Sequence, residues 1–132
     1  MIGLDTNILV RYLTQDDTVQ SRKAAEIIER RLPVEGPGFI SVVAIVETVW
    51  VLARVYRVSA DEIAAAIEAI LQTDVLVIEN EQEVFAAMVA LREGSGSFAD
   101  ALIAALGTKA GCSRTLTFDR DARLLPGFEL VA

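Results

Sequence analysis

Short runs of β-branched and other apolar residues alternate along the chain with longer segments in which apolar positions recur every three or four residues. The short runs predict buried strands, and the longer spacing predicts helices with one face toward a core. The expected strands occupy residues 2–4, 39–40, 75–78, 114–118 and 128–131. Strands that alternate with helices indicate an α/β fold with a parallel sheet, in which ligands bind beyond the carboxyl ends of the strands.

Polar residues that cap helix N-termini precede most of the helical segments. Asp17 or Thr18, Ser41, Ser59 and Ser97 each stand before an apolar periodic stretch, and Gly111 follows the last one. Helices are therefore expected over about residues 6–14, 18–32, 41–56, 59–73, 80–92 and 97–110. A loop is expected at residues 33–38, which contain two prolines and two glycines.

Composition and length fit one compact domain over residues 1–132. Hydrophobic residues make up 53% of the chain and charged residues 23%, which excludes disorder. No apolar run reaches the ~20 uncharged residues of a membrane helix, and the N-terminus lacks a basic leader, so we expect a cytoplasmic protein. The single cysteine, Cys112, permits no internal disulfide, and we expect its side chain to be buried or half-buried.

The net charge of −7, from 12 basic and 19 acidic residues, argues against a protein that holds nucleic acid by charge alone. It does not exclude a nuclease whose metal ions offset the acidic groups. It also favours a basic protein partner.

Four acidic residues stand where an apolar segment begins or ends: Asp5, Glu47, Asp100 and Asp119. Carboxylates are rarely buried unless they are paired or bind a metal. Several of them on separate apolar elements suggest one shared site, and oxygen-only ligands suit Mg²⁺ or Mn²⁺. Because the chain has no histidine, His-dependent acyl transfer and His-ligated zinc are excluded.

Three of these carboxylates also have a local structural explanation. Asp5 could cap the first helix, and Asp100 could complete a capping box with Ser97. Asp119 and Asp121 could seal a turn.

The fourth, Glu47, lies in an apolar helix, where the structural alternative is an ion pair with Arg54. It is less probable that all four structural explanations hold together than that the four carboxylates form one shared site. Accessory residues that could orient carboxylates or waters are Thr6, Asn7 and Thr117.

Residues 2–9, 41–47, 98–104 and 117–121 resemble the four signature blocks of PIN-domain nucleases, in order and over essentially the whole chain. More narrowly, the chain resembles the VapC-type toxins of prokaryotic toxin–antitoxin pairs. The resemblance implies a three-layer fold with a short, mainly parallel central sheet flanked by helices. It also implies a Mg²⁺- or Mn²⁺-dependent endoribonuclease that leaves a 3′-hydroxyl and a 5′-phosphate. The implied partners are RNA, a second copy in a homodimer, and an antitoxin with a basic and apolar tail that occupies the acidic groove.

By position, the resemblance makes Asp5 and Asp100 the central metal ligands, while Asp119 completes the site. Glu47 would act directly or through water. Asp121 is a possible accessory, and Thr117 matches a hydroxyl residue common at that place in the family. One departure is Ser97, where many relatives carry Asp.

Three other functions stay open from the sequence. Aspartyl-phosphate phosphotransfer proteins also begin with a strand that ends in Asp, as at Asp5. They need a second acid two residues later or a late lysine near the phosphate, whereas here position 7 is Asn and Lys109 lies within a helix. A housekeeping RNA-processing nuclease would share all the motifs, and a non-catalytic PIN-like module would show degenerate carboxylates. We expect Trp50, Tyr12 and Tyr56 in the core or a dimer interface, with base stacking as the alternative.

Overall fold

The computed structural model describes residues 1–131 and divides the chain into two compact units, which are described separately. Unit 1 is Met1–Glu79 and unit 2 is Asn80–Ala132. The single domain expected over residues 1–132 stays a prediction, and its last residue lies outside the described part. None of the helices in residues 1–131 has the length and apolar character needed to cross a lipid bilayer.

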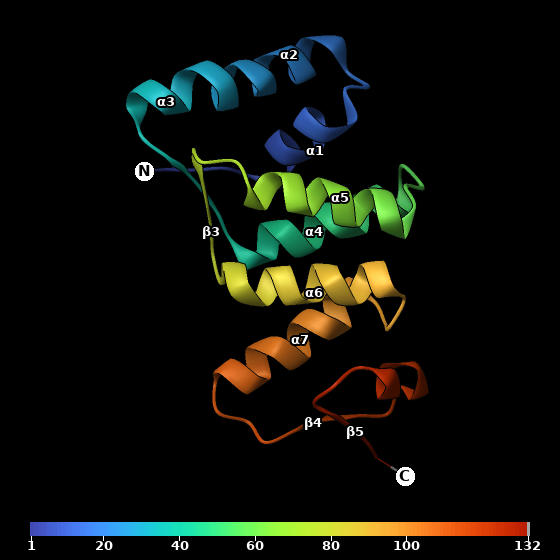
Figure 1. The fold of residues 1–132 in the computed structure, drawn as a ribbon. Coiled ribbons are helices and arrows are strands. Elements are labelled where there is room, and N and C mark those ends of the chain that lie inside the picture. Colours follow the sequence, from blue (N-terminus) through green and yellow to red (C-terminus); the bar gives the residue numbers. More distant parts are fainter. Residues whose placement is uncertain (132) are drawn as a thin grey trace. The chain divides into compact units, whose positions relative to one another are not determined.

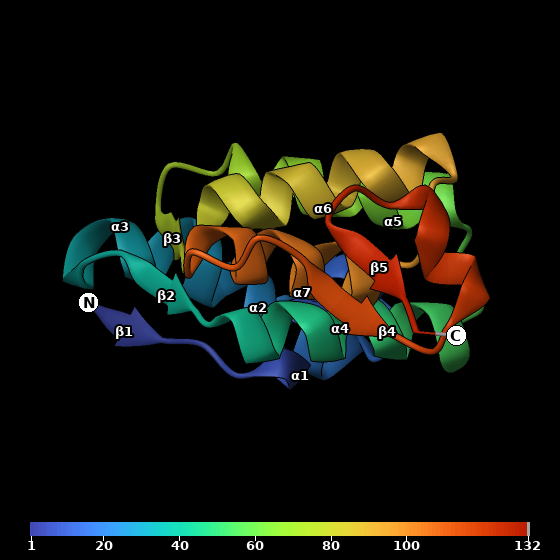
Figure 2. The same ribbon diagram turned by 90° about the horizontal axis from the view of Figure 1, so that it is seen from below.

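Unit 1 contains a three-stranded parallel sheet in the order β1-β2-β3 (Figures 1 and 2). The strands are β1 (Ile2–Gly3), β2 (Gly38–Ile40) and β3 (Leu76–Ile78). Backbone pairing continues past β1, because the Leu4 N–H donates to the carbonyl of Phe39 at 2.9 Å. The parallel strands place the ends of β1 and β2 at one edge of this sheet.

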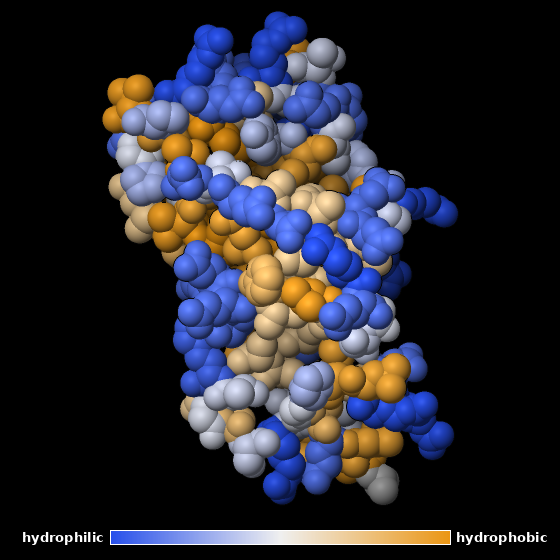
Figure 3. All heavy atoms as spheres, viewed as in Figure 1, coloured by the Kyte–Doolittle hydropathy of each residue, from blue (hydrophilic) through white to orange (hydrophobic). Residues whose placement is uncertain are grey.

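The helices of unit 1 begin where their caps predict. They are α1 (Thr6–Thr14), α2 (Thr18–Glu26), α3 (Leu32–Glu35), α4 (Val42–Arg54) and α5 (Ala60–Leu71). Asp17, Ser41 and Ser59 each accept a hydrogen bond from a backbone N–H two or three residues into the helix. Hydrophilic residues cover the outer side of α2 in Figure 3, while Ser21 and Ala24 are buried.

One boundary in unit 1 was predicted wrongly. The helix does not end at residue 32 but continues through a π-helical turn, η1 (Ile27–Arg31), into α3. Pro33 lies directly after this π-helical turn, and Gly36, with φ of 120°, ends the helix. The predicted loop therefore begins only at Gly36.

Unit 2 combines two packed helices with a two-stranded parallel sheet. The elements are α6 (Glu81–Glu93), α7 (Phe98–Lys109), β4 (Thr115–Thr117), the 3₁₀ turn η2 (Arg120–Leu124) and β5 (Phe128–Leu130). Ser97 caps α7 as expected. Asn80 precedes α6, but its side chain accepts a hydrogen bond from Lys109 Nζ at 2.7 Å instead of capping the helix. The sequence did not predict η2.

The α/β class and the parallel strand pairing are confirmed. Two expectations about single side chains are wrong. Cys112 is exposed, because it lies in the turn after α7 rather than on an apolar face. Trp50 is 57% exposed and so is no core residue, which leaves the interface and stacking alternatives.

Candidate functional site

Asp5 stands directly after β1 and caps α1. Its backbone is extended, and its Oδ1 accepts a hydrogen bond from the Thr6 N–H at 2.7 Å. The side chain is exposed, and Oδ2 makes no hydrogen bond within residues 1–131. The structural explanation for Asp5 is therefore correct, and it still leaves one carboxylate oxygen for a ligand.

Thr6 joins Asp5 to Glu47. The Thr6 residue is 8% exposed, and its hydroxyl donates a hydrogen bond to Glu47 Oε1 across 41 positions of sequence. Glu47 itself is exposed on α4, and within the described residues it bonds to Thr6 rather than to Arg54. The structural alternative, an ion pair with Arg54, is thus not what holds Glu47 in place.

Both carboxylates line one cleft of unit 1 with a volume of about 300 Å³. The lining combines polar side chains, among them Asn7, with three valines from α1, α4 and the residue after α4. The full lining is Asp5, Thr6, Asn7, Val10, Arg11, Glu47, Val51, Val55 and Tyr56. This mixture of free carboxylate oxygens and apolar surface suits a hard cation together with an organic substrate.

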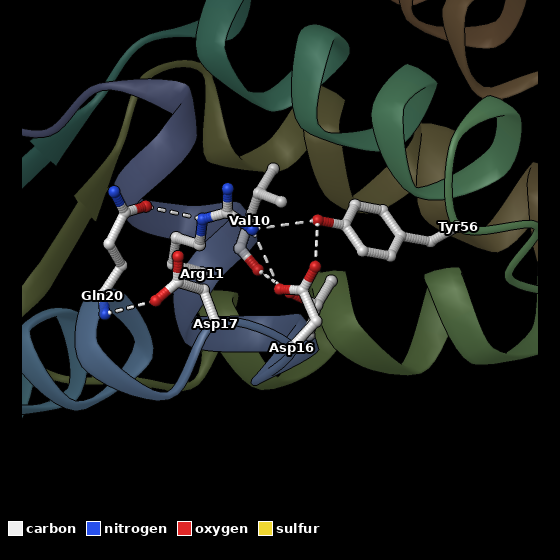
Figure 4. A network of polar contacts seen from close by, with 7 residues as sticks. Val10, Arg11, Asp16, Asp17, Gln20 and Tyr56 are labelled. Carbon is white, nitrogen blue, oxygen red and sulfur yellow. Dashed lines mark hydrogen bonds and ion pairs between the residues drawn. The ribbon is translucent and has the colours of Figure 1, made fainter.

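Arg11, at the rim of this cleft, belongs to a polar network that Figure 4 shows from close by. Its Nη1 donates to Asp16 Oδ1 at 2.9 Å and to the Tyr56 hydroxyl at 3.2 Å, while its Nε donates to Gln20 at 2.8 Å. The Tyr56 hydroxyl in turn donates to Asp16 Oδ2 at 2.7 Å. The network fixes the guanidinium and connects α1 with the segment that follows α4.

The same network shifts two pKa values. Hydrogen bonds from the hydroxyls of Tyr56 and Thr14, and then from Arg11, lower the pKa of Asp16 from 3.8 to about 2. The hydrogen bond to Asp16 raises the pKa of the Arg11 guanidinium above its ordinary value. Arg11 therefore carries its positive charge beside the two carboxylates of the cleft at every physiological pH.

Glu79, which follows β3 at the carboxyl edge of the sheet, was not predicted as a residue of this region. Its Oε1 accepts a hydrogen bond from the Val42 N–H at 2.8 Å, so Glu79 supplements Ser41 at the start of α4. The signal was its place directly after an apolar run, which is the same signal that singled out Asp5. Arg11 and Tyr56 were also missed as cleft residues.

In unit 2, Asp100 is half-buried in the first turn of α7, and its N–H donates to Ser97 Oγ at 3.1 Å. Asp119 is exposed and caps η2, because its Oδ1 accepts from the Asp121 N–H at 2.9 Å. The Asp119 N–H donates to Thr117 Oγ1 at 3.0 Å. Asp119 thus holds the turn position that the sequence suggested as its structural alternative. The Asp100 carboxylate completes no capping box within residues 1–131, because only the backbone N–H of Asp100 bonds to Ser97.

Hydrogen bonds to Thr6 thus bring two of the four acidic residues together, Asp5 and Glu47, and the other two, Asp100 and Asp119, belong to unit 2. No group of three or more Cys, Asp or Glu side chains in residues 1–131 is placed so that it could hold a metal ion. The donor chemistry nevertheless fits Mg²⁺ or Mn²⁺, since Asp5 and Glu47 each keep an oxygen without a hydrogen bond in the described structure.

The Asp16 network predicts a pH effect. Because the folded-state pKa of Asp16 is depressed, its contribution to stability is complete above about pH 4 and is lost as the pH falls toward 2. Substitution Tyr56→Phe removes the largest cause, so we expect the Asp16 midpoint to rise toward 3.8, measured by carbon-13 NMR titration of the carboxyl group. Tyr12→Phe is the matched control and should leave it unchanged. An unchanged midpoint in Tyr56→Phe would contradict the assignment.

Comparison with known families gives one match. The family described as the PIN domain matches residues 2–127, which is nearly the whole chain. A comparison with curated proteins found no match. PIN domains are in general metal-dependent nucleases. With the parallel strands, the capped helices after them and the acidic cleft already described, a match of this extent shows that the chain belongs to the PIN domain family.

Proposed function

We propose that the protein is a Mg²⁺- or Mn²⁺-dependent endoribonuclease that hydrolyses RNA phosphodiester bonds. One observation carries the proposal: in a PIN-family chain, Asp5 and Glu47 come from elements far apart in sequence and line one cleft through the hydrogen bonds of Thr6. The absence of histidine supports it, because no imidazole is available as a general base.

The proposed metal ligands are Asp5, Glu47, Asp100 and Asp119. All four offer carboxylate oxygens, which are the donors that small divalent cations prefer. When bound, such a cation lowers the pKa of a water molecule and offsets charge on a phosphate group.

The protein's own groups hold these carboxylates. Thr6 donates hydrogen bonds to one oxygen of Asp5 and to one oxygen of Glu47. The second oxygen of each carboxylate is then available for a ligand. Thr117 acts differently, because its hydroxyl accepts a hydrogen bond from the backbone N–H of Asp119. The N–H of Asp121 donates to one carboxylate oxygen of Asp119. Asn7 lines the cleft and could orient water through its amide.

Substitutions to Asn separate the ligand role from the capping role. Asn caps helices about as well as Asp, which applies to Asp5, and at Asp100 only the backbone N–H bonds to Ser97, which Asn retains. Asp5→Asn and Asp100→Asn should therefore keep the fold while lowering RNA cleavage by more than about 100-fold. Cleavage of a labelled RNA by purified protein in Mg²⁺ measures the effect, and circular dichroism checks the fold. Asp61→Asn, in the first turn of α5, is the matched control and should retain activity. Full activity in the Asp5→Asn, Asp100→Asn double variant would exclude the proposed site.

The link through Thr6 predicts a smaller and graded effect. Thr6→Val keeps the shape but removes the hydroxyl that bonds Glu47, so cleavage should fall by about 10- to 100-fold, the usual loss for a residue that orients a metal ligand. Thr6→Ser restores the hydroxyl and should stay within about threefold of wild type. Equal activity of the Val and Ser variants would show that Glu47 does not depend on Thr6.

We further propose that the nuclease is the toxin of a type II toxin–antitoxin pair in the cytoplasm. Support comes from the resemblance of its four motif blocks to VapC-type toxins and from its charge of −7, which suits an antitoxin with a basic and apolar tail. Exposed apolar side chains such as Leu116, Phe118 and Leu124 are compatible with a homodimer and a hetero-oligomeric complex.

A toxin differs from a housekeeping RNA-processing nuclease in its effect on a cell. Induced expression of wild type should arrest growth and create new 5′-phosphate ends at a restricted set of RNA sites, mapped by sequencing of 5′ ends. The Asp5→Asn variant should do neither. Growth without arrest, with cleavage limited to the maturation of precursor RNA, would favour the housekeeping function.

A further inference from the structure

One side of α4 carries an exposed stripe of four residues, and the proposed metal site accounts for only one of them, Glu47. Its members are Val43, Glu47, Trp50 and Arg54, spaced by four, three and four residues, so they lie along one face of the helix. Val43 is 75% exposed and Trp50 is 57% exposed, and both charged members are exposed as well. We call these four residues the α4 stripe.

The composition of the α4 stripe is unusual for a solvent-facing helix surface. Trp50 is the only tryptophan in the chain, and such a side chain is ordinarily largely buried. Arg54 ends the helix and Arg57 follows in the next turn, and neither forms a salt bridge within residues 1–131. In a chain of net charge −7, an aromatic ring is thus followed by two cations without acidic partners.

We propose that the α4 stripe binds single-stranded RNA beside the cleft, with a base stacked on Trp50 and a phosphate on Arg54. This inference rests on the proposed function, because it takes Glu47 as a residue of the nuclease site. Trp50 and Arg54 lie about 4.5 and 10.5 Å farther along the helix axis than Glu47. An aromatic ring followed by a cation is the arrangement that binds single strands without reading their sequence.

A protein partner fits the α4 stripe less well. The core of a protein–protein interface is depleted of charged residues, yet Glu47 lies between Val43 and Trp50, the two apolar members. A partner that covered both would take this carboxylate out of water. A stacked base covers only the ring of Trp50, and Arg54 supplies the charge that a phosphate requires.

Trp50 itself reports the binding, because its fluorescence is the only tryptophan signal of the protein. We would titrate full-length Asp100→Asn protein in Mg²⁺ with a 12-nucleotide single-stranded RNA, so that the RNA stays intact, and repeat the titration with the same RNA in a duplex. The single strand should quench the fluorescence with saturation, whereas the duplex, whose bases are already stacked, should not. Equal quenching by both would overturn the proposal.

Substitutions then separate stacking from a contact with a second copy. In the same background, Trp50→Ala should weaken binding of end-labelled single-stranded RNA about tenfold, and Trp50→Phe should stay within about threefold of the parent. Arg54→Ala should reduce the slope of log affinity against log salt by about one. Phe85→Ala, which removes an aromatic side chain that is 51% exposed, is the matched control and should change neither.

Three outcomes would overturn the α4 stripe as an RNA surface. The first is that the parent protein does not bind RNA. The second is that Trp50→Ala keeps both the RNA affinity and the oligomeric state of the parent. The third is that Trp50→Ala keeps the RNA affinity of the parent but shifts from dimer to monomer. If wild type cleaves RNA while Trp50→Ala binds it normally, the inference fails and the proposed function stands. If RNA binds through Trp50 but wild type does not cleave it, the proposed function fails and the binding surface stands.

Discussion

The hydrogen bonds of Thr6 are the constraint on which the geometry of unit 1 depends. Its N–H binds Asp5 at the end of β1, and its buried hydroxyl binds Glu47 on α4, 41 residues later. A single side chain thereby fixes the start of α1 against α4 and places two carboxylates in one cleft. Because both donors come from one residue, the two acidic groups cannot move independently while Thr6 stays in place. The proposed chemistry needs this kind of fixed arrangement.

Helix capping and metal binding make compatible demands on an aspartate. As caps, Asp5 and Asp119 each use one carboxylate oxygen. Asp100 lies in the first turn of α7 and uses only its backbone N–H, which donates to Ser97. The cap also holds the side chain at the helix N-terminus, where the helix dipole stabilises negative charge. The second oxygen stays available for a cation. The structural explanation of each aspartate therefore does not compete with the functional one, and the cap prepares the ligand.

The sequence predicted local features well, because caps and periodicity depend on neighbouring residues. The starts of α1, α2, α4, α5 and α7 follow directly from residues such as Ser41 and Ser59. It failed at Pro33, where a π-helical turn lets the helix continue. The partners of Tyr56 were also beyond reach, because its contacts with Arg11 and Asp16 join positions 40 or more residues apart. Motif order pointed to Asp5 and Glu47, but only the structure supplied Thr6 as the link.

We propose that the four carboxylates serve one metal centre, and calorimetric titration of the full chain with Mn²⁺ tests this proposal most directly. The proteins to compare are wild type, Asp5→Asn, Asp100→Asn and the double variant. If the two residues share a centre, each single substitution weakens Mn²⁺ binding. The loss of binding free energy in the double variant is then much smaller than the sum of the two single losses. Losses that add independently, or Mn²⁺ binding that neither substitution changes, would contradict the claim.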